Sequence, residues 1–358
     1  MLVRSIPGWF AIVLLASALG AQDKKPEDAR ARAKPFEGMV AGRKASLTLG
    51  ESWIEYKPAV IELPPGSAPW KLAGAWTSRK CEELTLRLFG IESAGATATT
   101  VRDAWFDLAK SKGAPGILVK ADLSNPKDKT LTGHDLECDF KNGEGKAYCW
   151  LRAVNLGKDK VAVLLCEERP LKPGPLEADE PNVETFVRDS HVAEVLPVLA
   201  SFLQPNPKPE EAWLRGPTFE VSYKTTSVTI DAPKGWAYTR RGAAGDVMWS
   251  APGNPGCNLV VGFGRGSFML LQVERDLIKR GVGKILQDRA IESPATGTEL
   301  TFTSTGFGNT VWIWRRVFER DGVCSFVETK IFVKDNSASP SADVLKSFKA
   351  FHDSARIK

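Results

Sequence analysis

The chain has 358 residues, of which 43% are hydrophobic and 25% are charged, and it carries a formal net charge of +5. These values are ordinary for a globular protein and argue against a disordered chain or an integral membrane protein. Lys and Arg are interspersed with Asp and Glu, so we expect no nucleic-acid partner. The length favours two domains over one.

The first residues predict a secretory signal peptide. Arg4 precedes an apolar run from Trp9 to Leu19, and small residues follow before the chain becomes charged. This run is too short to span a hydrocarbon core, which needs about 20 residues. We therefore expect cleavage near Ala21, no transmembrane segment afterwards, and a periplasmic or secreted protein.

Two similar segments follow, and together they form an internal repeat of low identity. Each contains strands with alternating apolar and polar residues, an amphipathic helix, hairpins with Asn, Asp or Gly in their turns, and a closing helix. An acidic, Pro-rich insertion at 168–182 lengthens the first segment before its closing helix. The matched positions are Tyr56/Tyr223, Trp70/Trp236, Trp76/Trp249, Trp150/Trp314 and Phe202/Phe348.

Both amphipathic helices are predicted from an apolar stripe at helical spacing. Thr100 with Asp103 indicates a capping box at the start of the first helix. The stripe consists of Val101, Ala104, Trp105 and Leu108 in the first helix, and of Leu270, Val273, Leu277 and Ile278 in the second.

This order of elements predicts an α+β protein of two tandem antiparallel-sheet α/β/α sandwich domains. The predicted parts are a signal peptide (1–21), a charged tether (22–47), a first domain (48–204), a Pro-rich linker (205–217) and a second domain (218–358).

The second segment also carries a recognisable series of motifs. These are VTIDAPKGW (228–236), GNTVWIWRRVFE (308–319), FVETKIFV (326–333) and the closing DVLKSFKAF (343–351). In this order they resemble the PsbP-like superfamily of small α/β/α sandwiches, which includes photosystem II extrinsic proteins and DcrB-type bacterial envelope lipoproteins. The first segment resembles it more weakly. The resemblance implies a fold and an extracytoplasmic accessory role, and it implies no catalytic residues.

Six cysteines in an exported chain favour disulfides. Cys138 and Cys149 are equidistant from the NGEG turn at 142–145, so a hairpin sets them opposite each other, and we expect a disulfide there. Cys257 and Cys324 are a second candidate pair because they are the only cysteines of the second segment.

Metal and nucleotide sites are weaker hypotheses. Structural zinc sites use closely spaced cysteine pairs, which this chain lacks. The run GFGRGSF at 262–268 has glycines at 262, 264 and 266, which is not the G-x-G-x-x-G of a dinucleotide site, although Arg265 could help to bind an anion. We predict no cofactor and no metal. The candidate zinc ligands would be His134, Cys138, Cys149 and Cys166.

Catalytic motifs are also lacking. The three histidines are His134, His191 and His352, and the sequence contains neither G-x-S-x-G nor H-E-x-x-H. Several of the eleven tryptophans recur at matched places in both segments, which favours a role in the core over a ligand-binding face. We expect Trp213, in the linker, to be the most exposed.

The sequence thus predicts an exported, non-catalytic protein with a binding or accessory role. Its partner would be an envelope protein or a small ligand. The alternative is an extracytoplasmic hydrolase with its site between the two domains.

Overall fold

The structure is a computed structural model. It describes residues 34–58, 63–64, 70–81, 84–112, 114–142, 145–168, 194–204, 213–241, 246–264, 267–292, 296–306, 308–320 and 322–358. The predicted signal peptide, the predicted insertion beyond residue 168, His191 and Arg265 lie outside the described residues.

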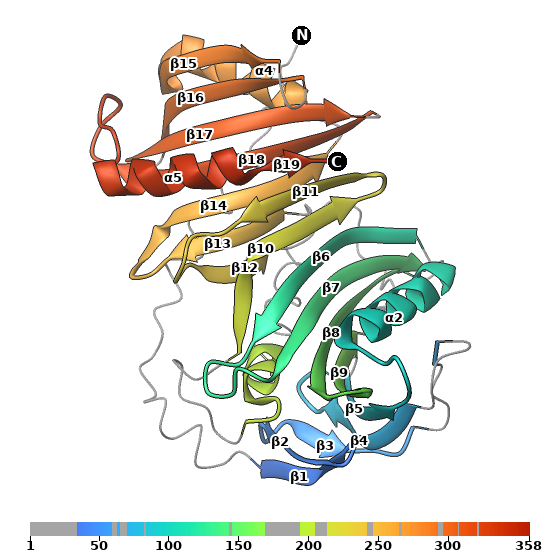
Figure 1. The fold of residues 1–358 in the computed structure, drawn as a ribbon. Helices are drawn as coiled ribbons and strands as arrows, with labels where there is room; N and C mark the ends of the chain where they lie inside the picture. The colour runs from blue at the N-terminus through green and yellow to red at the C-terminus, as the bar shows by residue number, and fades with distance from the viewer. Residues whose placement is uncertain are drawn as a thin grey trace.

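The fold is α+β and mostly antiparallel sheet, as the order of elements predicts (Figure 1). The first half contains β1 (Lys34–Val40), β2 (Arg43–Leu49), β3 (Trp53–Glu55), β4 (Trp70–Ser78), β5 (Leu84–Glu92), α2 (Ala98–Lys112), β6 (Ala114–Ser124), β7 (Thr132–Asn142), β8 (Gly145–Gly157), β9 (Lys160–Glu168) and a helix at 194–201. The second half contains β10 (Leu214–Tyr223), β11 (Thr226–Asp231), β12 (Ala237–Arg241), β13 (Asp246–Ala251), β14 (Asn254–Gly264), α4 (Ser267–Leu277), the π-helix η3 (Ile278–Val282), β15 (Gly283–Ile291), β16 (Gly297–Gly306), β17 (Asn309–Arg320), β18 (Val323–Val333), α5 (Ala342–Ser354) and β19 (Arg356–Ile357).

The strand order repeats between the two halves. The first half runs β3-β4-β5-β9-β8-β7-β6 and the second runs β12-β13-β14-β18-β17-β16-β15, so each strand has a counterpart. In the first half, α2 covers one face of the sheet. The β1–β2 hairpin and the helix at 194–201 pack on the other face, where Leu47, Trp76 and Phe202 share one core. In the second half, the β10–β11 hairpin and α5 take the corresponding place, around Trp249 and Phe348.

The two halves share one sheet. β10 pairs with β11 on one side and with β6 of the first half on the other, so a ten-stranded sheet runs from β19 to β3 (Figure 1). Val119 and Ala121 of β6 belong to the core around Trp249. β10 begins at Leu214, inside the predicted linker at 205–217, because its backbone completes the edge of β6.

Residues 34–47, which were predicted to belong to a charged tether, form β1 and most of β2. The hairpin is ordered because its alternate residues are apolar and buried, among them Ala45, Leu47 and Leu49. Phe36–Trp53 aligns with Phe219–Trp236 without a gap. Trp53 is therefore the counterpart of Trp236, and the match of Trp70 to Trp236 is wrong.

The helices also differ in detail from the prediction. α2 begins at Ala98, and Thr97 and Thr100 exchange the side-chain-to-backbone bonds of a capping box, one turn before the predicted one. In α4, Val273 is exposed while Leu271 is fully buried, so Leu271 replaces Val273 on the buried face, where Ile278 also packs.

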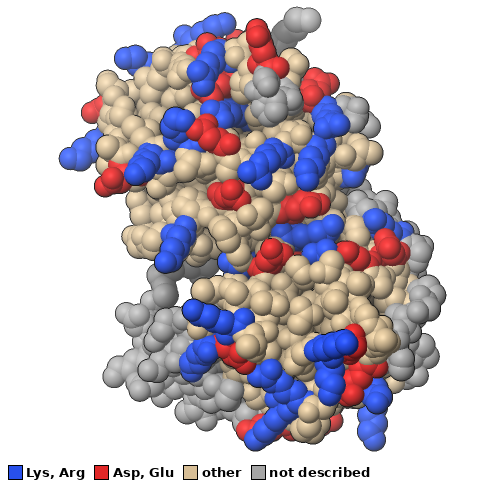
Figure 2. Space-filling model, viewed as in Figure 1, with Lys and Arg blue, Asp and Glu red and all other residues tan. Residues whose placement is uncertain are grey.

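Within the described part of the chain, no helix is both long and apolar enough to span a membrane. On the face seen in Figure 2, basic and acidic side chains alternate over both halves.

Candidate functional site

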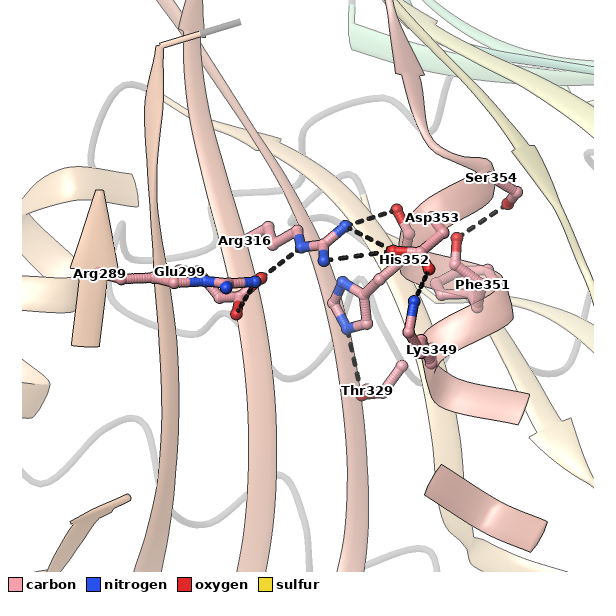
Figure 3. A network of polar contacts seen from close by, with 9 residues as sticks. All are labelled: Arg289, Glu299, Arg316, Thr329, Lys349, Phe351, His352, Asp353 and Ser354. Carbon is pink, nitrogen blue, oxygen red and sulfur yellow. Dashed lines mark hydrogen bonds and ion pairs between the residues drawn. The ribbon is translucent and has the colours of Figure 1, made fainter. Parts of the chain in front are cut away.

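A pocket lined by several charged side chains lies beside the end of α5, against β15, β16 and β17. It has a volume of about 440 Å³. Figure 3 shows the network of ion pairs and hydrogen bonds around it. Its lining consists of Arg289, Ala290, Ile291, Glu299, Arg316, Phe318, His352, Asp353 and Ala355.

Glu299 is the buried anion of this network, with 1% of its side chain exposed. Arg316 Nε donates to it at 2.6 Å, and an Arg289 guanidinium nitrogen lies 2.8 Å from its other oxygen. Burial alone would raise the pKa of Glu299, but the hydrogen bonds from the two arginines outweigh that effect and the pKa is lowered. Glu299 is therefore an ionised, doubly bonded carboxylate, poorly suited to be a general acid or base.

Arg316 also contacts the end of α5. One of its terminal nitrogens donates to the His352 carbonyl oxygen at 2.9 Å, and it lies 3.4 Å from Asp353 (Figure 3). Asp353 accepts a further bond from Lys349. The charges of the pocket thus neutralise one another.

His352 is buried and lies flat against Trp314, with ring centroids 4.3 Å apart. Its Nε2 is 3.2 Å from the Thr329 hydroxyl oxygen, which is itself fully buried. Burial, together with the charge of Arg316, holds the pKa of His352 well below its usual range, so the ring is neutral. Because Thr329 is buried, it could not attack a substrate from the pocket as an activated nucleophile.

The same arrangement occurs in the first half. Arg152 is the counterpart of Arg316 in the paired strands, and it binds Asp135 through two nitrogens at 2.7 Å each. A third nitrogen donates to the Leu199 carbonyl oxygen of the closing helix at 2.5 Å. We call this set of an arginine, a carboxylate and a helix carbonyl the helix clamp. Each half contains one.

A serine near the end of each closing helix confirms the equivalence. The Ser201 hydroxyl accepts from the backbone N–H of Thr48 at 2.8 Å, and the Ser354 hydroxyl accepts from that of Asp231 at 2.9 Å. The clamp and the serines therefore align Leu199 with His352. The predicted match of Phe202 to Phe348 is wrong by two helical turns. Both closing helices contain a Ser-Phe pair, but the two pairs lie at different distances from the end of their helix.

The two helix clamps differ in the side chains that lie over them. In the first half, Arg215 of β10 adds a bond to Asp135 at 2.7 Å and pairs with Glu137. Tyr238 lies over the Arg215 guanidinium at 4.1 Å and donates to Glu137 at 2.8 Å. The region between the halves, where the hydrolase alternative places its site, is thus occupied at this point by bonded side chains. In the second half the corresponding region is the pocket.

The predicted disulfides are wrong, since all six cysteines are free and buried. Cys138 and Cys149 do lie opposite each other in β7 and β8, as the turn predicts. Opposed strand residues have Cβ atoms about 4.5–5.5 Å apart, wider than a disulfide prefers. Cys324 lies opposite Gly264, seven residues along β14 from Cys257, which is about 23 Å in a strand.

The remaining predicted residues do not form a site in the described part of the chain. Cys138 and Cys149 belong to the core under α2, whereas Cys166 belongs to the core on the opposite face. His134 lies 2.9 Å from Asp122, and burial lowers the pKa of His134. Among the described residues, no three His, Cys, Asp or Glu side chains are grouped as metal ligands.

Gly262, at the start of the glycine run, and most of the tryptophans have structural roles. Gly262 lies in β14, where an added Cβ would approach Phe326 and Asp246 within 2.4 Å. Trp213 is buried and donates to the Phe202 carbonyl oxygen, so the expectation that it is the most exposed is wrong. The tryptophans with less than a tenth of their surface exposed are Trp53, Trp70, Trp76, Trp105, Trp150, Trp213, Trp249 and Trp312.

The helix clamps are not evident from the amino-acid sequence. An arginine in a strand is expected to face solvent unless a buried carboxylate lies opposite it on the next strand, so its sequence pattern gives little indication of a clamp. Asp135 and Glu299 are these buried carboxylates. That each lies opposite an arginine becomes evident only once the strand pairing is known.

No family model matches this chain, and no curated protein matches it. Among solved structures it is similar to that of the immunity protein TplEi of T6SS from Pseudomonas aeruginosa complexed with "L" peptide. The identity is 10% over 90% of this chain and 97% of the other, with a TM-score of 0.27. A similarity at this level carries no argument about fold or function.

Proposed function

We propose that this protein is an exported, non-catalytic binding or accessory protein built from two domains of PsbP-like fold. The observation that carries the proposal is the duplication of the helix clamp. Arg316 and Glu299 in the pocket have counterparts in Arg152 and Asp135, which fasten the first closing helix in the same way. Because the same set of residues holds a closing helix in both halves, a structural role is enough to explain it and no catalytic role is required.

The chemistry of the pocket supports the same proposal. A hydrolase needs a nucleophile or an activated water beside a base with a free lone pair. Glu299 is engaged by two arginines, and Asp353 is engaged by Arg316 and Lys349. The neutral His352 ring is stacked on Trp314 and lies beside a buried threonine.

The repeated strand order supports two domains. Each set of seven strands carries its own hairpin and closing helix, which is what a tandem duplication of one sandwich would produce. The export proposal is supported by the sequence from Arg4 to Ala21.

Matched variants test the non-catalytic proposal. Glu299→Gln and Asp135→Asn each neutralise the carboxylate of one clamp, and only the first alters the pocket. We expect both variants to lower the melting temperature. We also expect the wild type and both variants to show no turnover of chromogenic esters, phosphates, glycosides or peptides above a buffer blank. Turnover by the wild type that Glu299→Gln abolishes and Asp135→Asn preserves would overturn the proposal.

Export is tested separately in native cells. The intact mass of the purified protein should correspond to a chain that begins near Gln22, and the protein should fractionate with the periplasm or the medium. A full-length mass with Met1 retained in the cytosolic fraction would contradict export.

A further inference from the structure

β15 is the last strand of the seven-stranded sheet. Within the described part of the chain it pairs with β16 alone. Its counterpart in the first half, β6, carries β10 on the corresponding edge, with Phe219–Tyr223 antiparallel to Ile117–Ala121. The same edge is therefore covered in one half and not in the other.

The strand that covers β6 also has a counterpart. β1 and β2 match β10 and β11 in register, since Glu37 lies opposite Ser46 as Glu220 lies opposite Thr229. In the described residues, β1 pairs with β2 alone. The edge by which β10 joins β6 is thus unused in β1.

We propose that β1 of a second copy of this chain adds to the free edge of β15, as β10 adds to β6 within one chain. The contact is heterologous, because it joins the first half of one molecule to the second half of another, and its repetition produces head-to-tail chains. The second copy is the occupant because its hairpin has the sequence pattern and the register of the segment that fills this position internally. This inference does not depend on the proposed function.

The surroundings of β15 fit this contact. The 440 Å³ pocket, which Arg289 and Ile291 of β15 line, lies in the region that β10 and Tyr238 cover in the first half. Met39 of β1 has 65% of its surface exposed, and Leu286 of β15 has 38%. The register of β6 with β10 would bring Met39 to the bulge of β15 at which Leu286 lies.

One pair opposes the association and provides its test. Glu220 lies opposite Lys120, and their charged groups are 3.7 Å apart. In the same register Glu37 of the second copy lies opposite Asp288. Within one chain Glu37 pairs with Lys44 and Asp288 pairs with Arg275, which reduces this repulsion. Like charges at directly opposed positions weaken strand pairing, so we expect the wild-type association to be weak.

Sedimentation velocity of the mature full-length protein over a range of concentrations tests the contact. The weight-average mass of the wild type should rise with concentration. Asp288→Lys and Glu37→Lys each replace the like-charged pair by an attractive one, although each also removes an ion pair within its own chain, to Arg275 or to Lys44. Each should lower the dissociation constant, by up to about three- to tenfold. The double variant should have a dissociation constant close to that of the wild type, because two lysines then face each other.

Glu55→Lys is the matched control, since Glu55 is an exposed acidic residue in the edge strand β3, away from β15. It should leave the dissociation constant unchanged. Circular dichroism and melting temperatures identify any variant that fails to fold. A wild type and single-charge variants that all stay monomeric would overturn the proposal. So would an association that Glu55→Lys shifts as much as Asp288→Lys, or one that closes at a symmetric dimer.

Discussion

At the scale of single residues, the helix clamps show how a buried arginine is stabilised. Removing a charge from water is costly, and an ion pair offsets that cost only when its remaining hydrogen-bonding groups are also satisfied. Arg152 meets this condition with two bonds to Asp135 and one to a helix carbonyl. Burial would raise the pKa of Asp135, but Arg152 and Arg215 outweigh it, and the pKa is lowered.

The two clamps predict different costs for the same substitution. Arg152→Met should lower the free energy of unfolding by about 3–5 kcal/mol, because it leaves a carboxylate and a carbonyl oxygen buried with fewer partners. Arg316→Met should cost less, since 16% of the Arg316 side chain is exposed, against 5% for Arg152. Urea denaturation of the two variants measures the difference. Equal losses would show that burial does not set the strength of the clamp.

His352 predicts a dependence of stability on pH. Its pKa is lowered in the folded state by burial and by Arg316, so the unfolded chain binds a proton near pH 6.5 that the folded chain does not. Stability is therefore retained above about pH 6.5 and falls below it, by about 1.4 kcal/mol per pH unit for this residue. His352→Gln should reduce the slope measured by urea denaturation between pH 5 and 6.5. An unchanged slope would contradict a neutral, buried ring.

At the scale of elements, the sequence predicted the repeat but placed several of its matches wrongly. Trp150 and Trp314 were matched correctly, and the paired strands confirm it, because both lie in long strands with clear alternation. The β1–β2 hairpin was missed because its charged residues look like a tether when its strand pairing is unknown. The signal was present in the common spacing from Phe36 to Trp53 and from Phe219 to Trp236.

The cysteines show a similar limit. Turn symmetry placed Cys138 opposite Cys149 correctly, but it says nothing about the separation of their sulfur atoms. With all six thiols free, the cysteines give no support to export. The clamps could not be predicted either, because Arg152 and Leu199 are far apart in sequence and meet only through the packing of the closing helix.

The closing helices provide a test of the corrected register. Ser354→Ala and Ser201→Ala should each cost about 1 kcal/mol, because each removes the acceptor for a strand N–H. Ser347→Ala is the matched control. The sequence-based register equates Ser347 with Ser201, but Ser347 is half-buried and its hydroxyl donates to the Asp343 carbonyl oxygen of the same helix. Chemical denaturation of the three variants decides between the registers, and a loss at Ser347 equal to that at Ser354 would contradict the corrected one.

At the scale of the whole molecule, the ten-stranded sheet couples the two halves. β10 belongs to the second half by its hairpin with β11 and to the first half by its pairing with β6. Val119 of β6 is buried in the core of the second half, and Arg215 of β10 completes the clamp of the first. Each half therefore contributes to the stability of the other, which a flexible linker between independent domains would not produce.

This coupling predicts one cooperative unfolding transition for the full-length protein. Tryptophan fluorescence and far-ultraviolet circular dichroism should give coincident urea curves. Arg215→Met should separate them, because it leaves Asp135 and Glu137 buried at the junction with one partner fewer and weakens the contact that joins the halves. Lys120→Met is the control, since its pair with Glu220 lies on the same two strands but is more exposed. Two resolved transitions in the wild type would show that the shared sheet does not couple the halves. A single transition that Arg215→Met leaves cooperative and equally stable would show that Arg215 does not contribute to the coupling.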